Sequence, residues 1–491
     1  MGQSTRADER TSGFTGFLDR YFEISARGST LGREIRGGLV TFFAMSYIVV
    51  LNPLILGTVP DGSGQFIGGN PDLAVPRVAA VTALIAGVMC IVMGLWARFP
   101  LAIAAGMGLN AVVAYSIALM PEAGLTWADA MGIVVLEGII ILILVLTGFR
   151  EAVFKAVPLE LKMAISVGIG LFIAFVGLVN AGIVRPGEGT PVDLGVGGSL
   201  GGWPSAIFVI GLFTAAVLWV RKVRGALLIA IVGTTLLAIL VETLFSVGQA
   251  GEDNPYGWQL TPPELSGSPI ALPDFALLGQ FSLLGSIEKV GIVVVILLVF
   301  TLLLADFFDT MGTMVAVGAE ADLLDKEGNP PRTREILVVD SIAAIAGGMG
   351  SSSSNTSYIE SAAGVGEGAR TGLSTVITGI GFLLATFLAP LVALVPFEAA
   401  TPVLVLVGFM MMAQVAGIDW KRAEVAIPAF LVIILMPFTF SIAAGMGAGF
   451  IAYVVIQVAY GRAKKVHPLM WVASILFIFY FVRGPIGALL G

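Results

Sequence analysis

The chain has 491 residues, of which 57% are hydrophobic and only 12% are charged, and its mean hydropathy is +0.97. Soluble domains usually carry about 25% charged residues, so this composition excludes a soluble protein and predicts a polytopic membrane protein. The net charge of −7 says little about partners, because in such proteins the placement of Lys and Arg matters more than their sum.

Residues 1–36 form a charged segment without the apolar core of a cleavable signal peptide. Its aromatic and aliphatic residues recur at helical spacing among charges, which predicts a short interfacial helix before the first span. A disordered tail with a few aromatic residues is the alternative. The residues that carry this pattern are Phe14, Phe17, Leu18, Tyr21 and Phe22.

Apolar runs of about 20 residues, the length that spans a bilayer as a helix, follow in two sets of seven. Residues 37–247 hold the first set, at 37–57, 78–98, 101–120, 130–149, 162–184, 204–220 and 225–247. After a hydrophilic loop at 248–286, residues 287–461 hold the second set, at 287–312, 336–350, 352–367, 371–396, 401–418, 424–443 and 445–461. Residues 462–491 add a basic turn and an apolar run at 468–487, for which crossing the membrane and lying along its surface both stay open.

Basic residues fix the expected orientation. Counted from a cytoplasmic N-terminus, every inside loop carries Lys or Arg, whereas the loop at 248–286 is acidic and lies outside. Seven spans followed by seven invert the second set relative to the first, which is the arrangement of inverted-repeat transporters. We therefore expect an all-α protein of about 14 transmembrane segments in the cell membrane.

Two stretches interrupt the apolar runs at matching places, in the third and tenth segments. They are Ala105–Asn110 and the longer Gly347–Glu360, which contains four consecutive serines. Polar, glycine-rich backbone is tolerated at membrane depth only where it lines a cavity or is buried in protein. Paired interruptions of this kind predict a substrate site near the middle of the membrane.

Acidic residues within the apolar segments are the next site candidates, because each costs at least about 2.5 kcal/mol at the bilayer centre. Asp306 and Asp309 are three residues apart and share one face of a helix, and Glu360 ends the tenth-segment interruption. Glu137 and Asp340 lack polar neighbours in the sequence, so packing contacts between helices explain them equally well.

These groups favour a particular kind of solute. Free backbone N–H groups at a broken helix, carboxylates, the Asn110 amide and nearby aromatic rings suit a planar heterocycle with donors and acceptors around its edge. The sequence contains no phosphate-binding loop, no His/Cys set with metal spacing and no nucleophile elbow, so neither an enzyme nor a cofactor or metal is expected.

Several long motifs resemble the adenine/guanine/hypoxanthine permease branch of the nucleobase-ascorbate transporter superfamily, and the resemblance covers roughly residues 14–487. The motifs include Thr41-Phe-Phe-Ala-Met-Ser-Tyr47, Gly106-Met-Gly-Leu-Asn-Ala111, Asp306-Phe-Phe-Asp-Thr-Met-Gly-Thr313 and Thr356-Ser-Tyr-Ile-Glu-Ser-Ala-Ala-Gly-Val365. The residues at 351–355 depart from the usual sequence of the branch at this place, so the preferred purine stays open.

The resemblance implies core and gate domains, purine uptake coupled to protons, and homodimers. It places Asn110, Asp306 and Glu360 in the substrate site, with Asp309 supporting it. To these we add Gly108, Asn355 and Thr356 from the interrupted segments, and the candidates for the coupling proton are Asp306, Asp309 and Glu360. No nucleic-acid partner is expected. An anion or other small-solute transporter of the same fold and a passive facilitator remain the alternatives.

Overall fold

The structure is a computed structural model that describes residues 14–120, 124–148, 157–187, 189–264, 268–326 and 328–490. Ten helices in this part of the chain are long and apolar enough to cross a membrane. Three shorter apolar helices cover Met107–Ala118, Ala423–Phe438 and Pro468–Val482. The prediction of a helical protein with many membrane segments is confirmed.

The first half of the chain begins with α1 (Phe14–Phe22), at the place of the expected interfacial helix. The remaining elements up to residue 245 are α2 (Leu31–Met45), α3 (Ile48–Leu56), α4 (Pro71–Val92), η2 (Met93–Ala97), β1 (Ile103–Ala105), α5 (Met107–Ala111), η3 (Val112–Ala118), α6 (Trp127–Thr147), α8 (Leu159–Asn180), β2 (Val184–Arg185), β3 (Asp193–Leu194), α9 (Gly202–Val220) and α10 (Ala226–Phe245).

The second half follows a similar order of elements. It contains α11 (Gly285–Val290), α12 (Ile292–Glu320), α13 (Thr333–Met349), β4 (Asn355–Ser357), α14 (Ser361–Gly366), α15 (Gly372–Ala385), η5 (Thr386–Leu388), α16 (Ala389–Val392), α17 (Phe397–Met412), η6 (Ala413–Gly417), α18 (Ala423–Phe438), α19 (Ile442–Ala459), η7 (Ala463–Lys465) and α20 (Pro468–Leu490). The third and tenth expected segments are therefore each a three-residue strand followed by a short helix.

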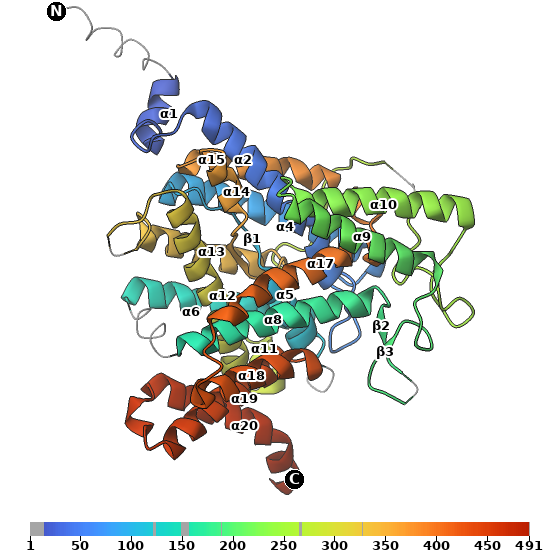
Figure 1. Ribbon diagram of the computed structural model, residues 1–491, viewed down its shortest axis with the longest axis vertical. Helices are drawn as coiled ribbons and strands as arrows, with labels where there is room; N and C mark the ends of the chain where they lie inside the picture. The colour runs from blue at the N-terminus through green and yellow to red at the C-terminus, as the bar shows by residue number, and fades with distance from the viewer. Residues whose placement is uncertain are drawn as a thin grey trace, which may run out of the picture.

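The strands are the main departure from an all-α chain. β1 pairs with β4, and β2 pairs with β3, in two separate antiparallel ladders. Broken helices leave N–H and C=O groups without intrahelical partners, and such groups are costly to bury unpaired. Pairing the two interrupted segments with each other satisfies these groups inside the protein. Figure 1 shows β1 near the centre of the molecule, surrounded by helices.

The helices pack in two groups. The first packing group contains α2, α3, α4, α6, α12, α13, α14 and α15, with its closest packing between α6 and α13 and between α4 and α15. The second packing group contains α8, α9, α10, α17, α18 and α19, with α8 against both α17 and α18. Contacts between the groups are sparser, and they include α12 with α8 and α19. The short helix α5 contacts both groups, through α3 and α12 of the first and α8 of the second.

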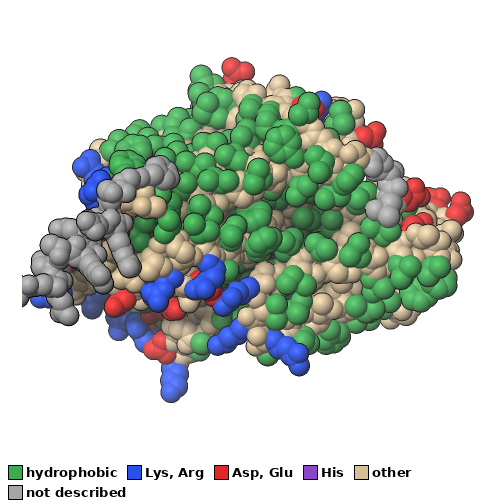
Figure 2. All heavy atoms as spheres, turned by 90° about the horizontal axis from the view of Figure 1, so that it is seen from above, with side chains coloured by type: hydrophobic (Ala, Val, Ile, Leu, Met, Phe, Trp, Pro, Cys, Tyr) green, Lys and Arg blue, Asp and Glu red, His purple; other side chains and the backbone are tan. Residues whose placement is uncertain are grey.

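The surface is consistent with a membrane environment. Figure 2 shows a broad hydrophobic face with Lys and Arg side chains gathered along one margin and mainly Asp and Glu side chains near the opposite margin. Large apolar side chains that are more than half exposed include Phe213 and Val220 on α9 and Leu236 on α10. Hydrocarbon chains are the solvent that suits such a face.

The acidic loop at 248–286 is fastened to the helices by an ion pair. Asp274 in this loop accepts a hydrogen bond of 2.7 Å from Nε of Arg77 on α4. This hydrogen bond holds the pKa of the Asp274 carboxyl below its usual value. The loop is thus held against the same end of the first packing group as the start of α4.

Candidate functional site

The centre of the candidate site is the ladder between β1 and β4. Ala104 lies opposite Thr356 and Ala105 opposite Asn355. The ladder continues on either side, because the N–H of Gly106 donates to the carbonyl of Ser354 and the N–H of Tyr358 donates to the carbonyl of Ala102, both at 2.9 Å. The two interrupted segments that the sequence marked at matching positions therefore meet each other directly, 250 residues apart in the chain.

The serine-rich turn before β4 is buried in protein. Ser352, Ser353 and Ser354 are fully buried, and Ser353 has a φ of 71°, in the left-handed region that non-glycine residues seldom adopt. Two helices of the first packing group hold the turn. The Asn52 amide on α3 donates to the Ser352 carbonyl at 3.1 Å, and the Ser354 hydroxyl donates to Oε2 of Glu137 on α6 at 3.0 Å.

Asp340 on α13 fixes β4 against α12. Its Oδ1 accepts a hydrogen bond from the Ser357 hydroxyl, and its Oδ2 accepts one from the Thr310 hydroxyl, both at 2.8 Å. Thr310 also shares a hydrogen bond of 2.7 Å with Thr356. Asp340 is thus a fully hydrogen-bonded carboxylate that positions the strand, and it has the polar neighbours that its sequence context lacks.

Asp306 is the least satisfied acid of the site. It is fully buried on α12, and neither of its carboxylate oxygens accepts a hydrogen bond from a donor in the described residues. The acids Asp340, Glu137 and Asp309 act on it electrostatically, and the Thr356 hydroxyl lies beside it. Because buried polar atoms are normally hydrogen-bonded, two free carboxylate oxygens at membrane depth indicate a group kept for a ligand or a proton.

Glu360 follows β4 and is only partly buried. Its Oε1 accepts a hydrogen bond of 2.6 Å from the hydroxyl of Tyr47, which lies at the break between α2 and α3. Glu360 and Asp340 both act electrostatically on Asp309, whose side chain is exposed. Gly312, one turn further along α12, also faces open space. Asp309 and Glu360 thus lie at an open side of the site.

Asn110 and Gly108 lie on α5, directly after β1. Asn110 is fully buried, and neither its amide nitrogen nor its amide oxygen has a hydrogen-bond partner in the described chain. Gly108 faces the second packing group, since a Cβ there would approach Cγ2 of Ile169 on α8 to 2.8 Å. Asn355 has one free atom as well, Oδ1, while its amide nitrogen donates to Ser352.

The structure thus places all the predicted site residues on the interrupted segments and α12. It links Thr356 to α12 by a hydrogen bond, and Asp306, Asp309 and Glu360 to one group of acids by electrostatic contact. Asn110 has no hydrogen bond that joins it to the others.

Two aromatic residues near the interrupted segments, Tyr115 and Tyr358, make contacts within the protein. Tyr115 packs edge-on against Phe172 and Phe440 of the second packing group. The Tyr358 hydroxyl donates to the Ala105 carbonyl at 2.6 Å and so braces the ladder.

Sequence reasoning missed Tyr47 and left the roles of Glu137 and Asp340 undecided. Tyr47 lies within the Thr41–Tyr47 motif, which marked the residue without giving it a role. The only signal for the two acids was their cost at membrane depth.

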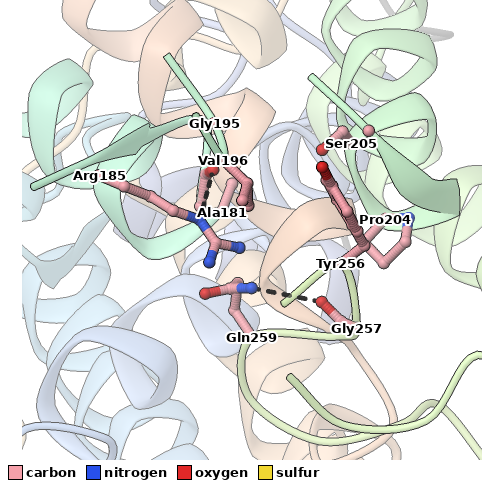
Figure 3. Close-up of a pocket in the computed structure, with 11 residues that line it drawn as sticks. Ala181, Arg185, Gly195, Val196, Pro204, Ser205, Tyr256, Gly257 and Gln259 are labelled. Atoms are coloured by element: carbon pink, nitrogen blue, oxygen red, sulfur yellow. Dashed lines mark hydrogen bonds between the residues drawn. The ribbon is translucent and has the colours of Figure 1, made fainter. Parts of the chain in front are cut away.

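A pocket at the loop side of the molecule is a separate feature. Arg185 of β2 and Gln259 point into it beside Tyr256 and Ser205 (Figure 3). Its volume of about 10 Å³ holds about one water molecule, so it is too small for a heterocycle. Among the described residues, no cluster of three or more His, Cys, Asp or Glu side chains is arranged to hold a metal ion.

Known proteins resemble this chain over nearly its whole length. The profile of the permease family matches residues 32–448. The guanine/hypoxanthine permease PbuG of Bacillus subtilis is 39% identical over 469 residues, which cover 95% of this chain and 99% of the relative. The adenine permease AdeP of Escherichia coli is 36% identical over 474 residues, which cover 96% and 97% of the two chains.

Two solved transporters share the fold. The transmembrane domain of the cyanobacterial bicarbonate transporter BicA has a TM-score of 0.54 and 18% identity, and the match covers 84% of this chain and 97% of that one. The murine anion transporter Slc26a9 in its inward-facing state has a TM-score of 0.56 and 11% identity, with 94% and 74% covered. With the sequence matches, these similarities show that the chain belongs to the permease family, as a polytopic membrane transporter and not an enzyme.

Proposed function

We propose that the protein is a secondary active transporter that imports purine nucleobases together with protons across the cell membrane. The observation that carries the proposal is the set of buried polar atoms without partners around the β1–β4 ladder. They include both oxygens of Asp306, both amide atoms of Asn110 and Oδ1 of Asn355. A purine base has ring N–H and amino donors and ring nitrogen acceptors on one rigid plane, which complements a mixed set of this kind.

In this proposal, Asp306 and Glu360 accept hydrogen bonds from the base, and Asn110 fixes its orientation with one donor and one acceptor. Asn355 and Thr356 contribute from β4, and Gly108 lets the base approach the backbone of α5. The relatives named as guanine/hypoxanthine and adenine permeases support purines as the substrate class. Asp306, Asp309 and Glu360 are the candidates for the coupling proton, because each is an acid within or beside the site.

The arrangement of elements supports an inverted repeat of seven plus seven segments. Each half contains a strand followed by a short helix in its third segment, and the two strands run antiparallel, as inversion requires. The first packing group would act as the core domain that carries the site, and the second as the gate domain. The domain limits at 37–247, 248–286, 287–461 and 462–491 follow from this scheme.

The exposed face of α12 supports access from one side. Asp309, Gly312, Ala316 and Glu320 are all exposed and recur every three or four residues, so they form one stripe from the site to the end of the helix. The segment after that end carries Lys326, Arg332 and Arg334. By the positive-inside rule this is the cytoplasmic side, which also places the N-terminus in the cytoplasm. The substrate site of this structure would then be open to the cytoplasm.

An anion transporter is the main alternative, because the two solved proteins that share the fold are named as a bicarbonate transporter and an anion transporter. At 18% identity and below, that likeness concerns the fold alone. A site lined by Asp306, Asp309 and Glu360 would repel an anion unless the acids were protonated. A passive facilitator is the other alternative, and it would need no proton.

Uptake of radiolabelled adenine, guanine, hypoxanthine and uracil into cells that lack their own nucleobase transporters tests the proposal. We expect uptake of at least one purine, little uptake of uracil, and loss of accumulation when a protonophore is added. Asp306→Asn and Glu360→Gln should each abolish uptake at normal membrane expression. Glu252→Gln, in the exposed acidic loop, is the matched control and should leave uptake unchanged. Normal uptake in both site variants would refute the site, and uptake that resists the protonophore would favour a facilitator.

A further inference from the structure

Glu137 on α6 is a buried acid to which the proposed site gives no task. Its side chain is fully buried at the middle of α6, with apolar residues or glycine for two turns on either side. Oε2 accepts the hydrogen bond from Ser354, but Oε1 has no partner in the described residues. A purely structural role for Glu137 explains Oε2 and leaves Oε1 unexplained.

The free oxygen of Glu137 has one evident neighbour, the carboxyl group of Asp306. Glu137 on α6 and Asp306 on α12 lie on two helices that pack against each other, and their side chains come within hydrogen-bonding reach once one of them carries a proton. Both oxygens of Asp306 are also without a donor in the part of the chain that the structure describes, so these two buried side chains hold three unpartnered carboxyl oxygens. Ionised carboxylates are acceptors only, so the two groups can hydrogen bond directly to each other only when one of them carries a proton.

The surroundings of the pair carry further negative charge. Asp340 of α13 acts on both carboxyl groups, and Asp309 acts on Asp306. The basic residues on the helices packed on α6 are Lys289 of α11 and Arg334 in the first turn of α13. Lys289 pairs with Asp129 in the first turn of α6, about two turns before Glu137. From η3, the titratable side chain is Tyr115, whose hydroxyl accepts a hydrogen bond from Asn180.

Two carboxylates in contact cannot both stay ionised in a buried place without a cation. Repulsion and loss of hydration each favour keeping one proton on the pair, which then titrates as a unit. Opening the site to water on either side of the membrane restores hydration and lets the proton leave. A pair of this kind can therefore bind a proton from one side and release it to the other.

We propose that Glu137 holds the coupling proton and donates it in a hydrogen bond to Asp306, which thereby keeps its other oxygen for the substrate. This inference rests on the proposed function and makes Glu137, which lies outside the substrate-binding set, the proton-carrying residue.

The cycle balances one proton for one substrate. On the outside, hydronium gives a proton to Oε1 of Glu137, so an O–H bond forms and water is released. Asp306 stays ionised, takes the hydrogen bond from Glu137 and accepts N–H groups of the base. On the inside the base leaves, the O–H bond of Glu137 breaks, and water takes the proton. The empty carrier then returns with both groups ionised in a hydrated site.

The Glu137→Gln variant separates this role from a structural one. A glutamine oxygen still accepts the Ser354 hydroxyl, and its amide nitrogen donates permanently to Asp306, as protonated Glu137 would. Purified variants in proteoliposomes should keep exchange of labelled base across the membrane and lose accumulation driven by a pH gradient. Glu398→Gln is the matched control, since it changes another buried glutamate with a free oxygen outside the site, and it should keep both activities.

Infrared titration of the substrate-free protein gives a second readout. As the pH is lowered, we expect the carbonyl stretch of a protonated carboxylic acid to appear, which Glu137→Gln removes and Asp306→Asn shifts, because its hydrogen-bond acceptor changes. Gradient-driven accumulation by Glu137→Gln at the wild-type level, or an acid band that both variants leave in place, would overturn the inference. If Glu137→Gln fails to fold, the infrared band in Asp306→Asn tests the inference instead, and an unshifted band overturns it. If the wild-type protein moves no purine, the proposed function is refuted. The infrared result alone then tests whether Glu137 holds a proton that it donates to Asp306.

Discussion

The hydroxyl of Tyr47 donates a 2.6 Å hydrogen bond to Oε1 of Glu360 across 313 residues of sequence. Tyr47 is buried where α2 gives way to α3, and Glu360 follows β4 at the open side of the site. A short hydrogen bond to a carboxylate is among the stronger interactions a protein makes. The bond therefore fixes which way Glu360 points.

Tyr47→Phe should weaken substrate binding without unfolding the protein. The ring remains and fills the same space, while Glu360 loses its donor, and a hydrogen bond to a charged group contributes about 1.5 to 3 kcal/mol. We expect KM for purine uptake to rise by roughly ten- to a hundredfold, since each 1.4 kcal/mol is a factor of ten. Uptake measured over a range of purine concentrations gives this KM. Tyr460→Phe, an exposed tyrosine after α19, is the control, and an unchanged KM in Tyr47→Phe would show that Glu360 needs no orienting bond.

Asp340→Ala should loosen β4. Asp340 accepts from Thr310 and Ser357, and after its removal Thr310 can still bond Thr356, whereas Ser357 is left without an acceptor. A buried hydroxyl left unpaired costs about 1 to 3 kcal/mol. We expect a lower melting temperature of the purified protein together with loss of uptake. Asp340→Asn keeps one acceptor oxygen and should be less impaired in both measurements, so equal stability of Asp340→Ala and wild type would contradict this role.

Much of this architecture could be predicted from the sequence because it rests on local signals. Runs of apolar residues mark the helices, as 162–184 and α8 show, and the glycine-rich interruptions mark where helices break. The eighth segment ended too early in the prediction, since α12 continues to Glu320. Amphipathic turns after Asp309 lower the hydropathy without ending the helix.

The contacts within the site could not be predicted in this way. The pairing of Ala105 with Asn355, and of Tyr47 with Glu360, joins residues hundreds of positions apart. Helical periodicity places a residue on a face but does not say which distant helix that face meets. Glu137 illustrates this: its cost at membrane depth marks it as unusual, and only the tertiary structure shows that it lies between Ser354 and Asp306.

The two arginines that pair with Glu367 should be redundant. Glu367 follows α14, and its carboxylate pairs with Arg36 of α2 at 2.8 Å and with Arg224, which precedes α10 in the second packing group. The arginines are about 60% exposed, but the Glu367 side chain is only 9% exposed. Exposed pairs contribute about 0 to 1 kcal/mol, so Arg36→Gln or Arg224→Gln alone should change the melting temperature little.

The double variant Arg36→Gln/Arg224→Gln should lose more stability than the two single variants together, because it leaves a nearly buried carboxylate without a cation. A double-mutant cycle on purified protein in detergent measures this difference. Adding Glu367→Gln to the double variant should restore part of the lost stability. Strict additivity of the single effects would show that the carboxylate is well hydrated instead.

Close helix crossing at Gly372 should make this position intolerant of any side chain. A Cβ on Gly372, at the start of α15, would lie 2.1 Å from the carbonyl oxygen of Gly94 in η2, and a Cβ on Gly94 would lie 2.4 Å from the carbonyl of Gly372. The backbones meet here without intervening side chains, as small residues allow in membrane proteins. Because the obstructing atoms are backbone atoms, Gly372→Ala has to push η2 and α15 apart, and overpacking of this kind costs about 1 to 3 kcal/mol.

Gly233→Ala is the matched comparison within α10, where a Cβ meets nothing within 4 Å. There alanine is favoured over glycine by about 1 kcal/mol in a helix, so this variant should melt at or above the wild-type temperature. Thermal unfolding of both purified variants therefore gives shifts of opposite sign, and a Gly372→Ala protein as stable as wild type would mean that α15 and η2 do not cross this closely.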